Sequence, residues 1–149
     1  MSTMDPRKVI QDYQEAINKK DLDKAMSLVA DDVIAVVPEG TLKGKAANRR
    51  YFEWVLKVPA ENKITDNRFV ETAIYAQGNV VTFEYSVEGT TKKGKMSVPA
   101  VAVAEIKDGK LFRVHNYYDR LAMAKQMASG VVATRTINAV ISQMEKGLR

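Results

Sequence analysis

The residues best suited to chemistry lie together in the run His115-Asn116-Tyr117-Tyr118-Asp119, at the end of a predicted strand. An imidazole and a carboxylate can move protons, whereas an amide and two phenols can donate hydrogen bonds to a carbonyl or enolate oxygen. Because side chains alternate across a strand, Asn116 and Tyr118 share one face and His115 and Tyr117 share the other. The run predicts acid–base or oxygen-binding chemistry beside a small-molecule pocket.

Two of these residues have a structural interpretation as well as a catalytic one. Asp119 stands where a strand gives way to a helix, and Asp is among the best helix caps. His115 is the only histidine in the chain, and imidazole is a natural acid–base group near neutral pH. If Asn116 faces the pocket, however, His115 faces the other side of the sheet, as a surface or interface residue.

Glu84 is the best remaining carboxylate for a general base, because a carboxylate desolvated in a pocket is suited to that role. It lies in the predicted strand Val80–Val87. One alternation places Glu84 in the pocket. The other places Phe83 and Tyr85 inward and leaves Glu84 in solvent.

Helices are predicted at both ends of the chain. Apolar spacing favours a helix over residues 6–18, with Asp5 as its cap. Asp21 caps a second helix, whose inward residues extend to Val29, and a third helix follows Gly44 and ends before Pro59. Helices return from Asp119 to about Met127 and over residues 131–149.

Runs with a period of two predict the strands. They are Val33–Val37, Phe69–Tyr75, Val80–Val87, Met96–Ile106 and Leu111–Tyr118. The last four form an antiparallel meander. The stretch Val98–Ala104 is apolar on both faces, so both faces are expected to be covered, and Pro99 predicts a bulge or a locally unpaired edge.

This order predicts an α+β fold, in which a curved antiparallel sheet packs against N-terminal helices and forms a cone that encloses a pocket. The length fits one domain, 1–149, with a C-terminal helical extension at 131–149. That extension could cover the mouth of the cone or pack on a second subunit, but packing of its apolar stripe on the chain's own body is the default expectation. Tyr13, Tyr51 and Trp54 lie on inward helix stripes, where aromatic residues form the core, contact a ligand, or do both.

Composition excludes several classes of site. The absence of cysteine removes disulfides and thiolate sites, and one histidine without an acidic calcium loop predicts no metal. The net charge of +5 is scattered, which favours a solvated surface over nucleic-acid binding. Either of the two densest basic groups could meet an anionic substrate tail, and these groups are Lys43, Lys45, Arg49 and Arg50, and Lys92, Lys93 and Lys95. With no apolar run of membrane-spanning length, we expect a cytoplasmic protein without membrane contact.

The chain resembles the SnoaL-like polyketide cyclases of the nuclear-transport-factor-two-like superfamily, whose relatives include ketosteroid isomerase. The likeness runs from Tyr13 to about Met127. The motifs that carry it are Asn18-Lys19-Lys20-Asp21-Leu22, Leu28-Val29-Ala30-Asp31-Asp32, Gly44 with Tyr51-Phe52, Gly89-Thr90, Asp108-Gly109-Lys110-Leu111 and Tyr117-Tyr118-Asp119. The resemblance implies the cone fold and cofactor-independent acid–base chemistry on an apolar ring compound.

The family's catalytic positions carry different residues in this chain. The cyclase aspartate corresponds to Asn116, and its paired histidine corresponds to Ala102. The oxyanion tyrosine of ketosteroid isomerase corresponds to Tyr13, but its general base corresponds to Val37. An amide cannot exchange a proton at neutral pH as a carboxylate does. The resemblance therefore implies the family fold with an altered site.

The similar limonene epoxide hydrolase uses an arginine and two aspartates, which correspond to Glu84, Ser86 and Asn116. That network is also incomplete in this chain.

Two functions follow from the sequence. The first is a cyclase, isomerase or dehydratase acting without a cofactor on a small apolar or aromatic ligand. Its candidate catalytic residues are Asn116, Glu84, His115 and Asp119, and its candidate substrate-binding residues are Tyr13, Tyr51, Trp54, Tyr118, Val114 and Ala102. The alternative is a non-catalytic ligand-binding or dimerisation module, with a homodimer formed through the sheet face of His115 and Tyr117.

Overall fold

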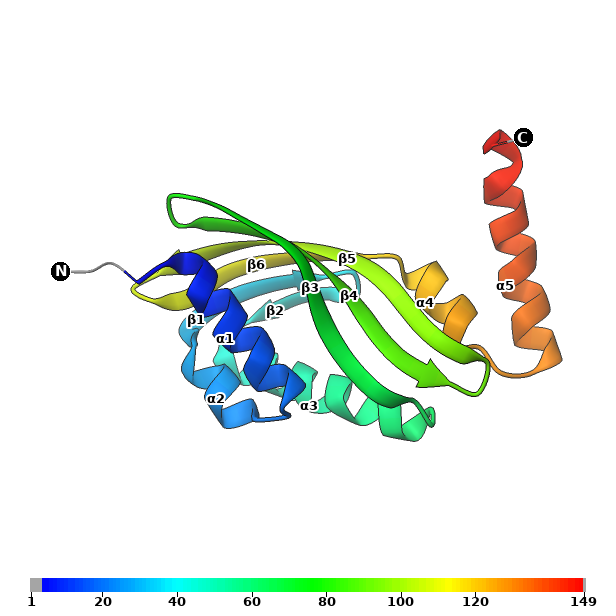
Figure 1. Ribbon diagram of the computed structural model, residues 1–149, viewed down its shortest axis with the longest axis horizontal. Helices are drawn as coiled ribbons and strands as arrows, with labels where there is room; N and C mark the ends of the chain where they lie inside the picture. The colour runs from blue at the N-terminus through cyan, green and yellow to red at the C-terminus, as the bar shows by residue number, and fades with distance from the viewer. Residues whose placement is uncertain (1–3, 149) are drawn as a thin grey trace.

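The computed structural model describes residues 4–148. Within this range six strands form one curved sheet in the order β2-β1-β6-β5-β4-β3, and the helices α1, α2 and α3 lie on one side of it (Figure 1). The predicted α+β cone is confirmed. Its sheet is mixed, because β1 and β6 pair in parallel while the other neighbours are antiparallel.

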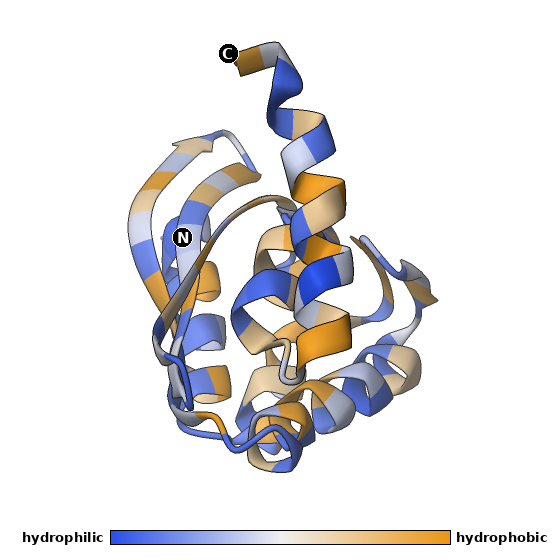
Figure 2. Cartoon of the chain, turned by 90° about the vertical axis from the view of Figure 1, so that its right-hand side faces the viewer, coloured by the Kyte–Doolittle hydropathy of each residue, from blue (hydrophilic) through white to orange (hydrophobic). Residues whose placement is uncertain are grey.

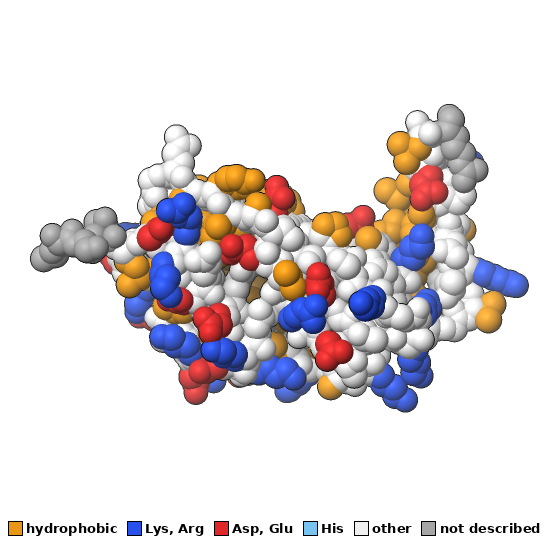
Figure 3. Space-filling model, in the orientation of Figure 1, with side chains coloured by type: hydrophobic (Ala, Val, Ile, Leu, Met, Phe, Trp, Pro, Cys, Tyr) orange, Lys and Arg blue, Asp and Glu red, His pale blue; other side chains and the backbone are white. Residues whose placement is uncertain are grey.

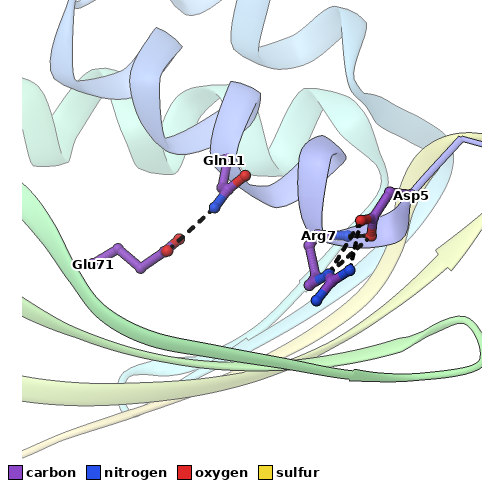
Figure 4. A network of polar contacts seen from close by, with 4 residues as sticks. All are labelled: Asp5, Arg7, Gln11 and Glu71. Atoms are coloured by element: carbon purple, nitrogen blue, oxygen red, sulfur yellow. Dashed lines mark hydrogen bonds and ion pairs between the residues drawn. The ribbon is translucent and has the colours of Figure 1, made fainter.

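The first two helices begin at the predicted caps. α1 spans Pro6–Asn18, and the Asp5 carboxylate accepts a hydrogen bond from the backbone N–H of Arg7 at 2.9 Å. α2 spans Leu22–Ser27, and Asp21 accepts from the N–H of Lys24. Figure 4 shows the Asp5–Arg7 pair, and beside it the side-chain contact that joins α1 to β3.

The region after α2 differs from the prediction. β1 spans Val29–Val37, so Val29 is its first residue and does not extend the helix. Asp31 and Asp32 are exposed residues of this strand, within the stretch where its pairing with β6 is irregular. β2 pairs with β1 only from Ile34 onward, so the carboxylate of Asp31 can remain in water, where it forms an ion pair with Lys45 at 2.8 Å. The pair of aspartates therefore does not interrupt the strand.

Two further differences concern the next elements. A short strand, β2 (Gly40–Lys43), pairs with β1 and was not predicted, since four residues give little periodicity. α3 spans Lys45–Glu61 and includes Pro59, which was expected to lie beyond its end. Pro59 has no N–H to bond the carbonyl four residues earlier, so the helix loses one hydrogen bond near its end. The carbonyl of Pro59 then accepts a hydrogen bond from the Ile64 N–H.

The antiparallel meander is present as predicted. Its strands are β3 (Thr65–Gln77), β4 (Val80–Thr91), β5 (Gly94–Lys107) and β6 (Lys110–Tyr118). Pro99 lies opposite Ser86 of β4 without a register shift, and pairing with β6 begins only at Ala100. Pro99, which has no N–H, therefore lies where β5 has no β6 partner. Of the two predictions for Pro99, the locally unpaired edge is the one found, and no bulge forms there.

The two faces of the sheet differ in cover. The inner face packs on the helices, and its β4 and β5 residues Val81, Phe83, Ala100, Ala102 and Ala104 are buried. On the outer face Val103 is 40% exposed and Tyr117 is 50% exposed. The expectation that both faces of Val98–Ala104 are covered is therefore wrong for a single chain.

Three helical segments follow the sheet. They are α4 (Arg120–Met127), α5 (Val131–Met144) and a 3-10 helix, η1 (Glu145–Leu148). α5 packs chiefly on α4 and extends away from the body, toward the side opposite α2 and α3 (Figure 1). Apolar residues stay exposed along it (Figure 2), among them Val132 and Met144. No helix within residues 4–148 is both long and apolar enough to cross a membrane.

Candidate functional site

A cavity of about 190 Å³ lies between the inner face of the sheet and the helices α1, α3 and α4. Its walls are mostly apolar and aromatic. Phe83 comes from β4, Tyr13 from α1, Tyr51 and Trp54 from α3, and Met123 from α4. An apolar cavity with a few polar groups is the usual form of a small-molecule site.

One polar group lies in the wall formed by β4 and β6. The hydroxyl of Tyr85 donates a hydrogen bond to Oδ1 of Asn116 at 3.3 Å. Within residues 4–148 the amide nitrogen of Asn116 has no hydrogen-bond partner, so its two N–H groups can donate to a ligand. Burial raises the pKa of Tyr85 above its ordinary value, and the nearby Tyr51 raises it further. Tyr85 therefore remains a neutral donor.

Tyr13 contributes a second phenol from α1. Its ring meets Phe52 edge-on, with ring centroids 5.8 Å apart. Burial raises its pKa, with smaller contributions from Tyr85 and Tyr51. No residue among those described accepts or donates a hydrogen bond at its hydroxyl, which therefore remains available to a ligand in the cavity.

Glu39, Tyr51 and Tyr118 form the other polar group of the cavity. Tyr118 donates a hydrogen bond to Oε1 of Glu39 at 2.6 Å, and the Nε of Arg120 lies 3.6 Å from the same oxygen. Burial raises the pKa of Tyr118, and the hydrogen bond to Glu39 and the nearby Tyr51 raise it further. Asn116 and Tyr118 are two residues apart on β6, so their Cα atoms are about 7 Å apart and their side chains leave the strand on the same face.

Glu39 is the residue that the sequence reasoning missed, because it lies in the Pro38-Glu39-Gly40 turn and was assigned only to that turn. The sequence nevertheless contains a pattern that places Glu39 on the cavity side. Ala35, Val37 and Glu39 continue one alternation, and all three line the cavity. The carboxylate therefore stands two residues beyond Val37, the position that corresponds to the base of ketosteroid isomerase.

Glu84 does not lie in the cavity. It is exposed on the outer face, while its neighbours Phe83 and Tyr85 are 6% and 8% exposed and line the cavity. The alternation that buries the two aromatic rings is therefore the correct one, because it removes far more apolar area from water. Ser86 is also outside the cavity, and its hydroxyl bonds to Glu88.

His115 and Asp119 are also outside the cavity. The His115 ring stacks on Tyr117 with centroids 4.1 Å apart, and Nδ1 lies 3.0 Å from the Tyr117 hydroxyl. Asp119 accepts hydrogen bonds from the N–H groups of Leu121 and Ala122, both at 2.9 Å, and so caps α4. Strand alternation determines the first position, and helix capping determines the second.

All but one of the predicted ligand contacts line the cavity. Tyr13, Tyr51, Trp54, Val114, Tyr118 and Asn116 line the cavity. Ala102 does not line it, since it is completely buried opposite Asn116 on β5. Among residues 4–148, no group of three or more His, Asp or Glu side chains could hold a metal ion.

The sequence matches the SnoaL-like domain family over residues 10–114. The chain belongs to this family. The match ends at Val114, just before Asn116 and Tyr118, so the polar end of β6 lies outside it. No curated protein sequence matches the chain significantly.

Solved structures of similar fold include two described as proposed polyketide cyclases. The one from Pseudomonas putida KT2440 is 26% identical, with a TM-score of 0.68, and the match covers 85% of this chain and all of the other. The one from Xanthomonas campestris pv. campestris is 27% identical, with a TM-score of 0.65, over 83% and 96% of the two chains.

A third structure, from Catenulispora acidiphila DSM 44928, is described as having a ketosteroid isomerase-like fold. It is 20% identical, with a TM-score of 0.66, over 80% of this chain and 91% of the other. At this identity the likeness concerns the fold alone.

Proposed function

We propose that this protein binds a small, mostly apolar ring compound and catalyses cofactor-independent proton transfer on it, as an isomerase, lyase or cyclase does. The observation that carries this proposal is a carboxylate, Glu39, held by Tyr118 in the wall of an apolar cavity beside the donors of Asn116. Its membership of the SnoaL-like family and the two similar structures described as proposed cyclases support the same class of reaction.

In this scheme Glu39 is the general base. It takes a proton from a carbon next to a ligand carbonyl, and the electron pair of the broken C–H bond moves into an enolate. The amide N–H of Asn116 and the hydroxyl of Tyr13 donate to the enolate oxygen, which is where negative charge develops. In an isomerisation the ligand carries a carbon–carbon double bond beside that carbon, so the anion is a dienolate, which takes the proton back from Glu39 at the far carbon of the conjugated system. In a cyclisation the enolate carbon instead attacks a second carbonyl of the ligand, and the alkoxide that forms takes the proton from Glu39.

The raised pKa values of the cavity tyrosines suit this role. Burial keeps Tyr13 and Tyr85 protonated, so both can donate hydrogen bonds without carrying a charge of their own. Tyr118 stays protonated for the same reason and orients the carboxylate of Glu39.

Glu39→Gln tests the base directly, in a screen of aromatic and alicyclic ring ketones. We expect turnover to fall by about 10²- to 10⁴-fold, because a general base contributes that much, while ligand affinity changes little. Glu84→Gln is the matched control, since it removes a carboxylate from the outer face of the same sheet. Equal turnover by the wild type and Glu39→Gln would show that Glu39 is not the base.

A non-catalytic carrier is the second candidate function. It is favoured by the amide and the methyl group at positions 116 and 102, where the cyclases carry acid–base residues. Mass spectrometry of the purified protein tests it. An intact ligand that copurifies and persists on incubation supports a carrier, whereas steady consumption of that ligand argues against it.

We also propose that the protein forms a homodimer through the outer face of the sheet. This face carries exposed Val103 and Tyr117 together with Glu105 and Arg113, a mixture of apolar and opposite charges that a second copy can complement. α5 extends to the same side (Figure 1). In sedimentation at micromolar concentration we expect a dimer, and Val103→Arg should be monomeric. A monomeric wild type would contradict this arrangement.

A further inference from the structure

A second hollow adjoins the cavity at its α4 end. Its volume is about 370 Å³, and Ile64 and Met127 line both spaces. Its walls are the end of α3, the turn between β4 and β5, and the link between α4 and α5. These two side chains belong to one apolar cluster and form the wall between the two spaces, so a ligand that occupies both must displace them.

The hollow is positively charged. Lys63, Lys92 and Lys93 line it, and Glu61 is its only carboxylate among the residues described, which leaves two positive charges in excess. None of the three lysines forms an ion pair within residues 4–148, whereas Lys45 is paired with Asp31. Other basic side chains are spread over the surface among acidic ones (Figure 3). The three lysines are thus a local concentration of unpaired charge.

The N-terminus of α5 lies beside the hollow. Gly130 lies in the wall of the hollow and precedes α5, whose N-terminus has no side-chain cap and no acidic residue in its first turn. The first N–H groups of a helix lack partners within it, and its dipole favours an anion at this end.

The wall on the α4 side is held in place by hydrogen bonds. The side chain of Gln126 accepts from the Ser97 N–H at 2.8 Å and donates to the Ser97 carbonyl at 3.0 Å. These two bonds fix the end of α4 against β5. One wall of the hollow is therefore the anchored end of α4, and another is the turn that carries Lys92 and Lys93.

We propose that this hollow binds the anionic end, a carboxylate or a phosphate, of a ligand whose apolar ring occupies the cavity. The substrate class is then an apolar ring compound with an acidic tail. This inference rests on the proposed ligand binding in the cavity but not on the proposed catalysis.

Three fluorescent probes with the same apolar part test the proposal. They are a naphthylpentanoate, its primary amide and a naphthylpentyl phosphate, each titrated into the wild-type protein at low salt. We expect one or both anions to bind about tenfold more tightly than the amide, since each partly exposed ion pair contributes about two- to fivefold. The comparison of the two anions tells a carboxylate tail from a phosphate tail.

The variant that removes the charge is the triple substitution Lys63→Gln, Lys92→Gln and Lys93→Gln. It should lose the preference for the anion and keep the affinity for the amide, which also shows that it is folded. Lys43→Gln is the control, because Lys43 is an exposed lysine on β2 outside both spaces. Added salt should weaken the binding of the anions and leave the amide unaffected.

Two kinds of result would overturn the proposal, and only the second would also contradict ligand binding in the cavity. If the amide binds but the anions have no advantage, or if the advantage survives in the triple variant, the anion site is absent and the cavity still binds its ligand. If none of the probes binds, the proposed ligand binding fails, and the anion site fails with it.

Discussion

The two faces of β6 come from one run of residues and have different roles. Asn116 and Tyr118 face the cavity, where they meet Tyr85 and Glu39. His115 and Tyr117 face outward and stack on each other. The difference shows that residue type alone does not identify a site: the chain's only histidine lies outside the cavity, whereas an exposed turn glutamate contributes to its wall.

The largest expected difference between the faces is in stability. Phe83→Ala should lower the free energy of unfolding by about 3–5 kcal/mol, because it removes a buried ring and leaves a cavity. Val103→Ala on the next strand should cost less than about 1 kcal/mol in the monomer, since Val103 is partly exposed. Urea denaturation measures both. Similar losses for the two variants would mean that the outer face is also packed.

The next difference concerns turnover. Asn116→Ala should reduce it by about 10²-fold, as expected for the loss of one oxyanion donor. His115→Ala, one residue away on the opposite face, should leave the monomer's turnover unchanged. Steady-state kinetics on a ring ketone found in the substrate screen would compare them. A larger effect from His115→Ala would reverse the assignment of the faces.

The next effect is on the stability of the protein at alkaline pH, which depends on the buried tyrosines of the inner face. Burial raises the pKa of Tyr85 and Tyr13 above their ordinary 10.0. The folded chain then keeps protons that the unfolded chain releases, so this stability is fully present below pH 10 and is lost as pH rises above it. The loss per buried tyrosine approaches about 1.4 kcal/mol per pH unit. Urea denaturation at several alkaline pH values should show a shallower decline for Tyr85→Phe, and an unchanged slope would contradict the burial of its hydroxyl.

The smallest expected effect is at Asp119. Asp119→Ala should cost about 1 kcal/mol, because the two capping bonds at the start of α4 are lost. Asp119→Asn should restore most of this stability, since an amide oxygen also caps a helix. Turnover per folded molecule should be the same for both variants. A loss of turnover in the stable Asp119→Asn variant would return Asp119 to the chemistry.

The sequence by itself determined the fold class, the meander of four strands and the caps at Asp5, Asp21 and Asp119. These features depend on local patterns, namely apolar spacing, alternation and capping residues, which are readable within a short window. Family motifs such as Asp108-Gly109 placed those elements within one known architecture. The helix stripes placed Tyr13, Tyr51 and Trp54 inward but left open whether they form core or contact a ligand. All three line the cavity, although Trp54 is 54% exposed.

Only the tertiary structure decided which face of β4 is inner, and which carboxylate enters the cavity. Alternation gives two faces without saying which one the helices cover, so Glu84 and Tyr85 could not be ranked from the sequence. Glu39 reaches Tyr118 across 79 positions of the chain, and the hollow of Lys63 and Lys92 joins segments that are also distant in sequence. Such proximity arises from the closure of the sheet over the helices, which no local pattern encodes.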